Sequence, residues 1–79
     1  MPMANREKEW AGKASRYLKA RLKQADVGYK ELAERLREHG LQETEAGIAS
    51  KLSRGTFPAT FLLAVLAVLE LEGIRLEDL

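Results

Sequence analysis

The apolar positions of this chain recur at spacings of three and four residues, the period of an amphipathic helix. No alternating apolar and polar run of useful length is present, and the helix formers Ala, Leu, Glu, Lys and Arg dominate. The pattern predicts helices over residues 6–26, 29–39, 45–54 and 58–72, with a closing turn or helix after them. We therefore expect an all-α protein, a compact four- to five-helix bundle that forms a single domain over residues 1–79.

Residues that favour helix ends separate these segments. Gly40 suits a left-handed ending of the second helix, and Gly55 suits the end of the third. Thr44 can cap free N–H groups at the start of the third helix with its hydroxyl. Pro58 is placed to be the first residue of the fourth helix, which should then continue almost to Gly73.

The third predicted helix has an outer surface of small and basic residues. Ile48 and Leu52, four residues apart, should face the core. The residues left for the outer surface are Ala46, Gly47, Ser50, Lys51, Ser53 and Arg54. Because glycine inside a helix costs about 1 kcal/mol relative to alanine, we expect Gly47 to permit close approach to another backbone, either of DNA or of a helix.

The fourth predicted helix is apolar on nearly every side, which is more than one small core should use. A large exposed apolar patch normally marks a partner site, and a twofold dimer is the commonest solution. The residues expected at such a homodimer interface are Phe57, Phe61, Val65, Val68 and Leu69. The alternative is that the long first helix covers this surface within one chain.

Charge is unevenly distributed, although the formal net charge is only +1. Residues 1–54 carry twelve Lys/Arg and eight Asp/Glu, whereas residues 55–79 carry one and four. Arg16, Lys19 and Lys23 cluster on the side of the first helix opposite its apolar side. This surface could face phosphate groups, and the alternative is a solvated helix face.

Several motifs occur here in the order found in a known family. They are Glu31-Leu32-Ala33, the series Thr44, Ile48 and Leu52, then Arg54-Gly55, and finally Pro58. In this order the chain resembles the lambda-repressor-like (XRE-type) helix-turn-helix family over roughly Arg21 to Leu79. The KxSRGxF string from Lys51 to Phe57 is also similar to a small family of uncharacterised bacterial domains, which brings no established activity.

Two departures from the XRE pattern concern the relative pose of the second and third helices. The connection after Ala33 is longer than the tight turn of that family, so either the second helix is longer or the turn is a loop. Arg21 matches an arginine that many XRE domains pair with a glutamate, but Ser53 occupies the glutamate position. Arg21 would then reach Glu31 or contact phosphate.

The resemblance implies a third helix that enters the major groove of double-stranded DNA. Ser50, Lys51 and Arg54 would reach base edges or phosphates, and Ala46 and Ala49 would contact thymine methyl groups. The candidate DNA-contact residues are Ala46, Gly47, Ser50, Lys51, Ser53 and Arg54, with Arg16, Lys19 and Lys23 as phosphate anchors. The alternative is that Lys51 and Arg54 only complement the dipole at the helix end.

We therefore expect sequence-specific binding of double-stranded DNA by a transcriptional regulator that acts as a homodimer. The alternative function is a protein-protein interaction module, of adaptor or antitoxin-like type, that uses the apolar fourth helix. Charge reversal at Lys51 and Arg54 would separate the two, because only DNA binding should be lost with it.

Other functions have little support in the sequence. The chain has one histidine, no cysteine, no glycine-rich phosphate loop and no metal-ligand spacing, so we expect no enzyme activity, metal, cofactor or small-molecule substrate. The longest apolar run, Phe61 to Leu69, has nine residues, about half of what a bilayer crossing needs. The first ten residues lack the apolar segment of a secretory signal, so we expect a cytoplasmic protein with no membrane partner.

Overall fold

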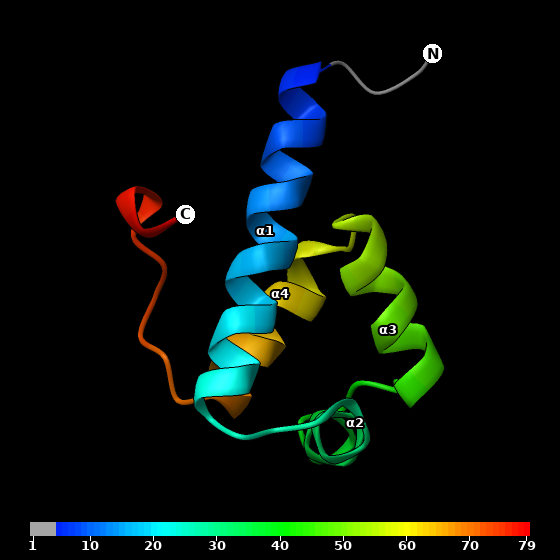
Figure 1. The fold of residues 1–79 in the computed structure, drawn as a ribbon. Helices are drawn as coiled ribbons and strands as arrows, with labels where there is room; N and C mark the ends of the chain where they lie inside the picture. The colour runs from blue at the N-terminus through cyan, green and yellow to red at the C-terminus, as the bar shows by residue number, and fades with distance from the viewer. Residues whose placement is uncertain (1–4) are drawn as a thin grey trace.

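The chain folds into four α-helices and one short 3₁₀ helix in a computed structural model, which describes residues 5–79. The elements are α1 (Asn5–Gln24), α2 (Tyr29–Glu38), α3 (Glu45–Arg54), α4 (Ala59–Val68) and the 3₁₀ helix η1 (Leu76–Asp78). In Figure 1, α1 stands in front of α4, α3 lies to the right, and α2 closes the bottom. The predicted all-α bundle is confirmed, with no strand in the part of the chain described.

The core is built from apolar residues at helical spacing on all four helices. Each helix contributes two side chains that are at most 2% exposed, namely Leu18 and Leu22, Leu32 and Leu36, Ile48 and Leu52, and Phe61 and Val65. The helix α3 packs against both α1 and α2, and α4 packs against α2. Ile48 and Leu52, the inward pair predicted for the third helix, are therefore buried by the fold as expected.

The local signals around α3 are confirmed. The Thr44 Oγ1 accepts a hydrogen bond from the Gly47 N–H at 3.0 Å, which caps the helix. At the end of α2, Gly40 has a φ of 89°, and the Leu41 N–H donates to the Leu36 carbonyl at 2.9 Å. This is the Schellman ending that the glycine predicts.

The ends of α1 and α4 come earlier than predicted. The first helix ends at Gln24 rather than at residue 26, and the fourth runs from Ala59 to Val68 rather than from 58 to 72. Asp26 and Glu70, just beyond these ends, both have a φ of 57°. The N–H groups that follow them donate five residues back, at 3.0 Å for Val27 and 2.9 Å for Leu71. Two more Schellman endings thus form with an acidic residue where glycine is usual.

Pro58 caps α4 from outside rather than forming its first residue. Its φ of −68° and ψ of 154° are those of extended backbone, and its carbonyl oxygen accepts the N–H of Phe61 at 3.0 Å. Pro58, with its fixed φ, therefore stands immediately before the first helical residue, Ala59, and still marks the start of α4.

The residues predicted to form a dimer interface lie in the core of the single chain. Phe61, Val65 and Val68 are 1%, 0% and 6% exposed, and Phe57 and Leu69 are half-buried against the same cluster. Leu18 and Leu22 of α1 belong to that cluster, and α4 packs against α2. The apolar side chains expected at a dimer interface are thus largely taken up within one chain, while Leu63 on the outer side of α4 stays 63% exposed.

The connection between α2 and α3 is a loop rather than an extension of α2. It runs over residues 39–44 and includes the turn at Gly40. The extra residues after Ala33, relative to the XRE pattern, therefore lie in this loop and not in α2 or α3.

No single helix among the described residues is long and apolar enough to cross a membrane. The helices α3 and α4 reach that length and hydropathy only when taken together, and they meet at a bend of 114°.

Candidate nucleic-acid interface

The solvent side of α3 is a surface of small side chains. Ala46, Ala49, Ser50 and Ser53 are all exposed, while Ile48 and Leu52 on the other side are 0% exposed. The exposed and buried residues lie on opposite sides of α3 because residues three or four apart in a helix share a face. We call these four residues the small-residue face, and no large side chain of α3 rises from it.

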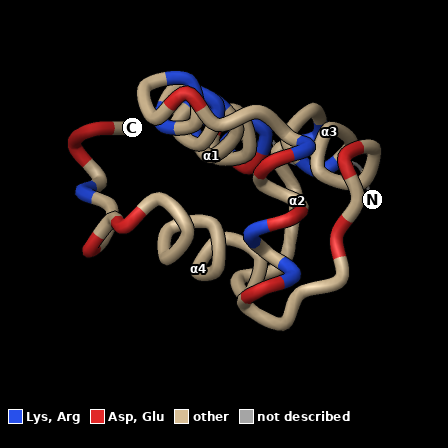
Figure 2. Tube along the Cα trace, turned by 90° about the horizontal axis from the view of Figure 1, so that it is seen from below, with Lys and Arg blue, Asp and Glu red and all other residues tan. Residues whose placement is uncertain are grey.

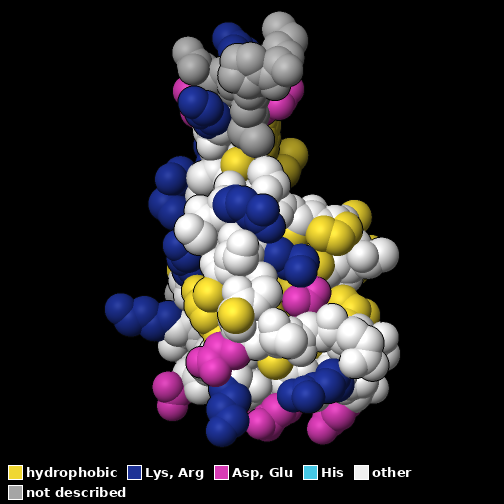
Figure 3. Space-filling model, turned by 90° about the vertical axis from the view of Figure 1, so that its right-hand side faces the viewer, with side chains coloured by type: hydrophobic (Ala, Val, Ile, Leu, Met, Phe, Trp, Pro, Cys, Tyr) yellow, Lys and Arg dark blue, Asp and Glu magenta, His cyan; other side chains and the backbone are white. Residues whose placement is uncertain are grey.

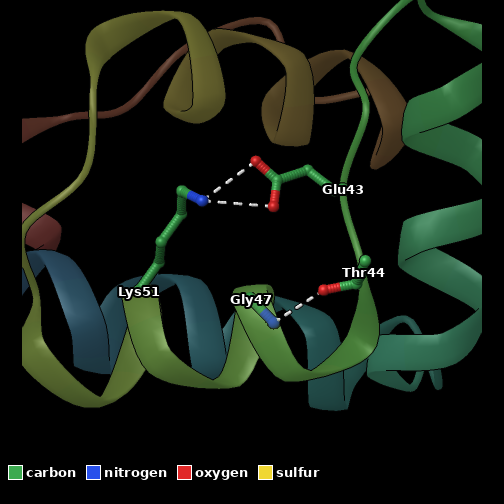
Figure 4. A network of polar contacts seen from close by, with 4 residues as sticks. All are labelled: Glu43, Thr44, Gly47 and Lys51. Atoms are coloured by element: carbon green, nitrogen blue, oxygen red, sulfur yellow. Dashed lines mark hydrogen bonds and ion pairs between the residues drawn. The ribbon is translucent and has the colours of Figure 1, made fainter.

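Lys51 does not belong to this face, although the sequence assigned it to the outer surface. Its Nζ lies 3.1 and 3.2 Å from the two carboxylate oxygens of Glu43 and 5.6 Å from the centroid of the Phe61 ring. Figure 4 shows the lysine side chain turned back over α3 toward Glu43 in the preceding loop. With side-chain exposures of 25% for Lys51 and 12% for Glu43, the pair is largely withdrawn from solvent.

Gly47 makes room for the same loop. A Cβ at this position would lie 3.1 Å from Thr44 Oγ1 and 3.4 Å from Glu43 Oε1. The atoms nearest to this position are thus the capping hydroxyl and the glutamate side chain (Figure 4), and no backbone of another helix approaches it as one of the two expectations had it.

Close backbone contact joins the end of α3 to α1. Gly55 has a φ of 70°, and a Cβ there would lie 2.2 Å from the carbonyl oxygen of Ala11. One turn further along α1, the buried Ser15 hydroxyl donates to the Leu52 carbonyl. These two contacts set the position of α3 beside α1.

Basic residues of α1 flank the small-residue face. Arg54 and Lys8 line one surface hollow with Gly12, and Arg16 Nη1 lies 3.0 Å from where a Cβ on Gly12 would be. Arg54 of α3 and Arg16 of α1 therefore both lie beside Gly12. Lys8, which is not among the residues predicted from the sequence, lies in the same hollow as Arg54, and its position four residues before Gly12 places it there.

Lys19 and Lys23 extend this basic surface along α1. Both are exposed, as is Arg16. Since Lys19 and Lys23 follow Ser15 at intervals of four residues, they lie on the side of α1 that borders α3. Figure 3 views the molecule from the α3 side and shows dark blue Lys and Arg side chains along one edge of α1 and across the middle of this face. We call Arg16, Lys19, Lys23 and Arg54 the basic border.

Acidic residues lie in several parts of the fold. In Figure 2 Lys and Arg positions lie along α1 and also on α2, α4 carries no charge, and the segment after α4 is mostly acidic. Negative charge near the small-residue face comes from Glu45, which is exposed at the start of α3. The acidic C-terminal segment borders the side of α1 that is turned away from α3, where Asp78 lies beside basic residues of α1.

Arg21 does not pair with Glu31, the carboxylate partner considered from the sequence. Its Nη1 donates to Gln24 Oε1 at 3.3 Å, and its guanidinium lies 5.8 Å from the centroid of the Tyr17 ring. Glu31 pairs instead with Arg35 at 2.5 Å. Arg21 thus faces the side of α1 away from α3, where it lines a groove with Lys13.

Groups that could hold a metal ion do not gather in the described part of the chain: no three His, Cys, Asp or Glu side chains come together there. The single histidine, His39, lies at the end of α2 with its Nδ1 3.0 Å from the Arg35 carbonyl. A structural role at the helix end accounts for it.

The fold and this surface define a small all-α domain that presents one short helix beside a basic helix. Residues 10–74 match the domain of unknown function DUF6471, and the chain belongs to this family. No curated protein and no solved structure matches the chain. Because the family carries no assigned activity, the function is argued from the surface itself.

Proposed function

We propose that this domain binds double-stranded DNA, with α3 in the major groove and the basic border against the phosphate backbone. The observation that carries the proposal is the exposed small-residue face of α3 directly beside Arg54 and Arg16. The major groove is about 12 Å wide and admits one α-helix. Small side chains let the helix backbone come close to the base edges, and cations beside it neutralise phosphates.

The roles divide between the two helices. On α3, Ser50 and Ser53 offer hydroxyl groups to bases or phosphates, and Ala46 and Ala49 offer methyl groups to thymine. The basic border supplies affinity that depends on salt rather than on sequence. Lys51 has no part in this assignment, because its ammonium group is engaged by Glu43.

The order of motifs shared with XRE-type domains supports the same placement of α3, and it extends the proposal to transcriptional regulation in the cytoplasm. The loop over residues 39–44 is longer than the turn of that family. We therefore base the proposal on the surface beside α3 and not on the angle between α2 and α3.

Binding of a fluorescent random 20-base-pair duplex, followed by anisotropy across a salt series, tests the proposal. We expect Arg16→Glu and Arg54→Glu each to weaken binding about tenfold at low salt, since each replaces a phosphate contact by a repulsion. Lys30→Glu is the matched control, because Lys30 lies in a surface hollow with Glu31 and Glu34. Absence of binding by the unaltered protein even at low salt would refute DNA binding.

A second candidate function is a protein-protein interaction module that uses the outer face of α4. Leu63 is 63% exposed on a helix without any charged residue. The same outer face of α4 is also the one we assign to self-association, because Phe61 and Val65 are buried. A protein that binds a twofold DNA site would use such self-association. Leu63→Asp separates the two functions: it should leave duplex binding by a single chain unchanged and abolish association seen in sedimentation.

A further inference from the structure

A groove lies on the side of α1 that faces away from α3. The C-terminal segment runs beside α1 in both Figure 1 and Figure 2, and η1 comes close to the middle of the helix. The groove between them is lined on α1 by Lys13, Arg16, Tyr17, Ala20, Arg21 and Gln24, and on the other side by Asp78 and Leu79.

Three basic side chains and one acidic side chain line the groove. None of Lys13, Arg16 and Arg21 takes part in an ion pair with another described residue. Two of these cations make cation–π contacts. Lys13 Nζ lies 4.8 Å from the Trp10 ring centroid, and Arg21 lies over the Tyr17 ring. Asp78 is the only acidic side chain in the lining. Uncompensated positive charge in a concave site favours an anion.

Arg16 connects this groove to the proposed DNA surface. It lines the groove with Asp78, and it also lies over Gly12, which shares a hollow with Arg54. A nucleic-acid strand that crosses the exposed side of α1 would therefore meet Arg16 first and the groove next. The backbone of such a strand carries one negative charge per nucleotide, so a further phosphate is within reach.

We propose that this groove binds a backbone phosphate of the same duplex, and that Asp78 competes with that phosphate in the free protein. The inference rests on the proposed function and adds its regulation by the acidic C-terminal segment. Glu77 does not share this role, because it pairs with Arg75. Binding of DNA thus displaces one carboxylate from a site with three cations.

The first experiment measures the salt dependence of duplex binding by anisotropy. The double variant Lys13→Gln, Arg21→Gln removes two of the three cations, and the slope of log K against log salt should become shallower by about 0.9, the value for one phosphate. The control is Lys30→Gln, Arg37→Gln, which removes two exposed cations of α2 and should leave the slope unchanged. Thermal unfolding of both variants verifies that the fold is retained.

The second experiment compares Asp78→Lys with Glu72→Lys at low salt. Both raise the net charge by two, and Glu72 is an exposed residue outside the groove lining. We expect Asp78→Lys to bind the duplex about threefold more tightly than Glu72→Lys, because only its charge change falls beside the phosphate site. The difference should disappear at high salt.

The inference stands only if both results are obtained. If the duplex binds but the slope is unchanged, or if the two lysine variants bind equally, the groove is not a phosphate site gated by Asp78, and DNA binding through α3 is unaffected. If no protein in the set binds the duplex, the proposed function fails and this inference fails with it.

Discussion

Gly55 meets two demands that no other residue type satisfies. Its φ of 70° lies in the left-handed region, and the position of its missing Cβ is taken by the carbonyl group of Ala11. An alanine there would be strained in conformation and would also push α3 away from α1.

We expect Gly55→Ala to lower the free energy of unfolding by more than about 2 kcal/mol, because the clash is with backbone and cannot be relieved by a rotamer change. Urea denaturation followed by circular dichroism measures this. The control is Gly73→Ala, where nothing lies within 4 Å of the added Cβ. It should change stability by less than about 0.5 kcal/mol, and an equal loss at both positions would contradict the argument.

Lys51 and Glu43 form a pair that we expect to stabilise the fold and not to bind DNA. Lys51→Gln should lower the free energy of unfolding by about 1–2 kcal/mol, between the values for exposed and buried pairs, because Glu43 is left without its partner. A double-mutant cycle with Glu43→Gln isolates the coupling. The salt slope of duplex binding should match that of the unaltered protein, and a shallower slope would show that Lys51 reaches phosphate.

At the scale of the element, the proposed DNA binding requires that the outer residues of α3 stay small. We expect Ala49→Glu to weaken duplex binding more than tenfold, since it places a negative, bulky side chain on the small-residue face. Ala67→Glu makes the same change on the exposed side of α4 and should bind like the unaltered protein. Thermal unfolding midpoints should be similar for both variants, and equal duplex binding by the two would count against α3 as the contact helix.

The helices themselves were predictable where their ends are set by local chemistry. Thr44, Gly40 and Gly55 each act within a few residues, so α3 was predicted with its observed bounds and α2 to within one residue. The exact ends of α1 and α4 were not predicted, because Asp26 and Glu70 take a left-handed conformation that is uncommon for residues other than glycine. Packing of the following residues, and not the local sequence, decides these ends.

The surface was predictable in part for the same reason. Helical period alone gave the exposure of Ala46, Ser50 and Ser53, but it could not show that Lys51 turns back to Glu43, eight residues earlier in the chain. The burial of Phe61 and Val65 likewise depends on where α1 lies relative to α4. Both errors concern contacts between elements, which a periodic pattern does not contain.

At the scale of the whole molecule, charge is unevenly distributed along the chain. Residues 1–54 hold the basic excess and residues 55–79 the acidic one, and the acidic C-terminal segment runs along one side of α1 (Figure 2). For the proposed DNA binding, this distribution would turn the other, basic side of α1 and α3 toward the polyanion.

From this distribution we expect a slope of log K against log salt of about −3.6 for the four cations of the basic border, with the groove adding about −0.9. Titration of the random duplex between low and moderate salt measures it. A slope near zero would mean that binding, if seen, does not depend on phosphate contacts.

The contact between Gly55 and Ala11 affects which residues of α1 and α3 can be replaced without changing the fold. Because two main chains touch there, the separation of the two helices is independent of the side chains that either one turns to solvent. Residues on those outward sides could therefore be exchanged widely without altering the spacing between them. The same scaffold could carry many different outward surfaces, provided that position 55 stays glycine and position 11 stays small.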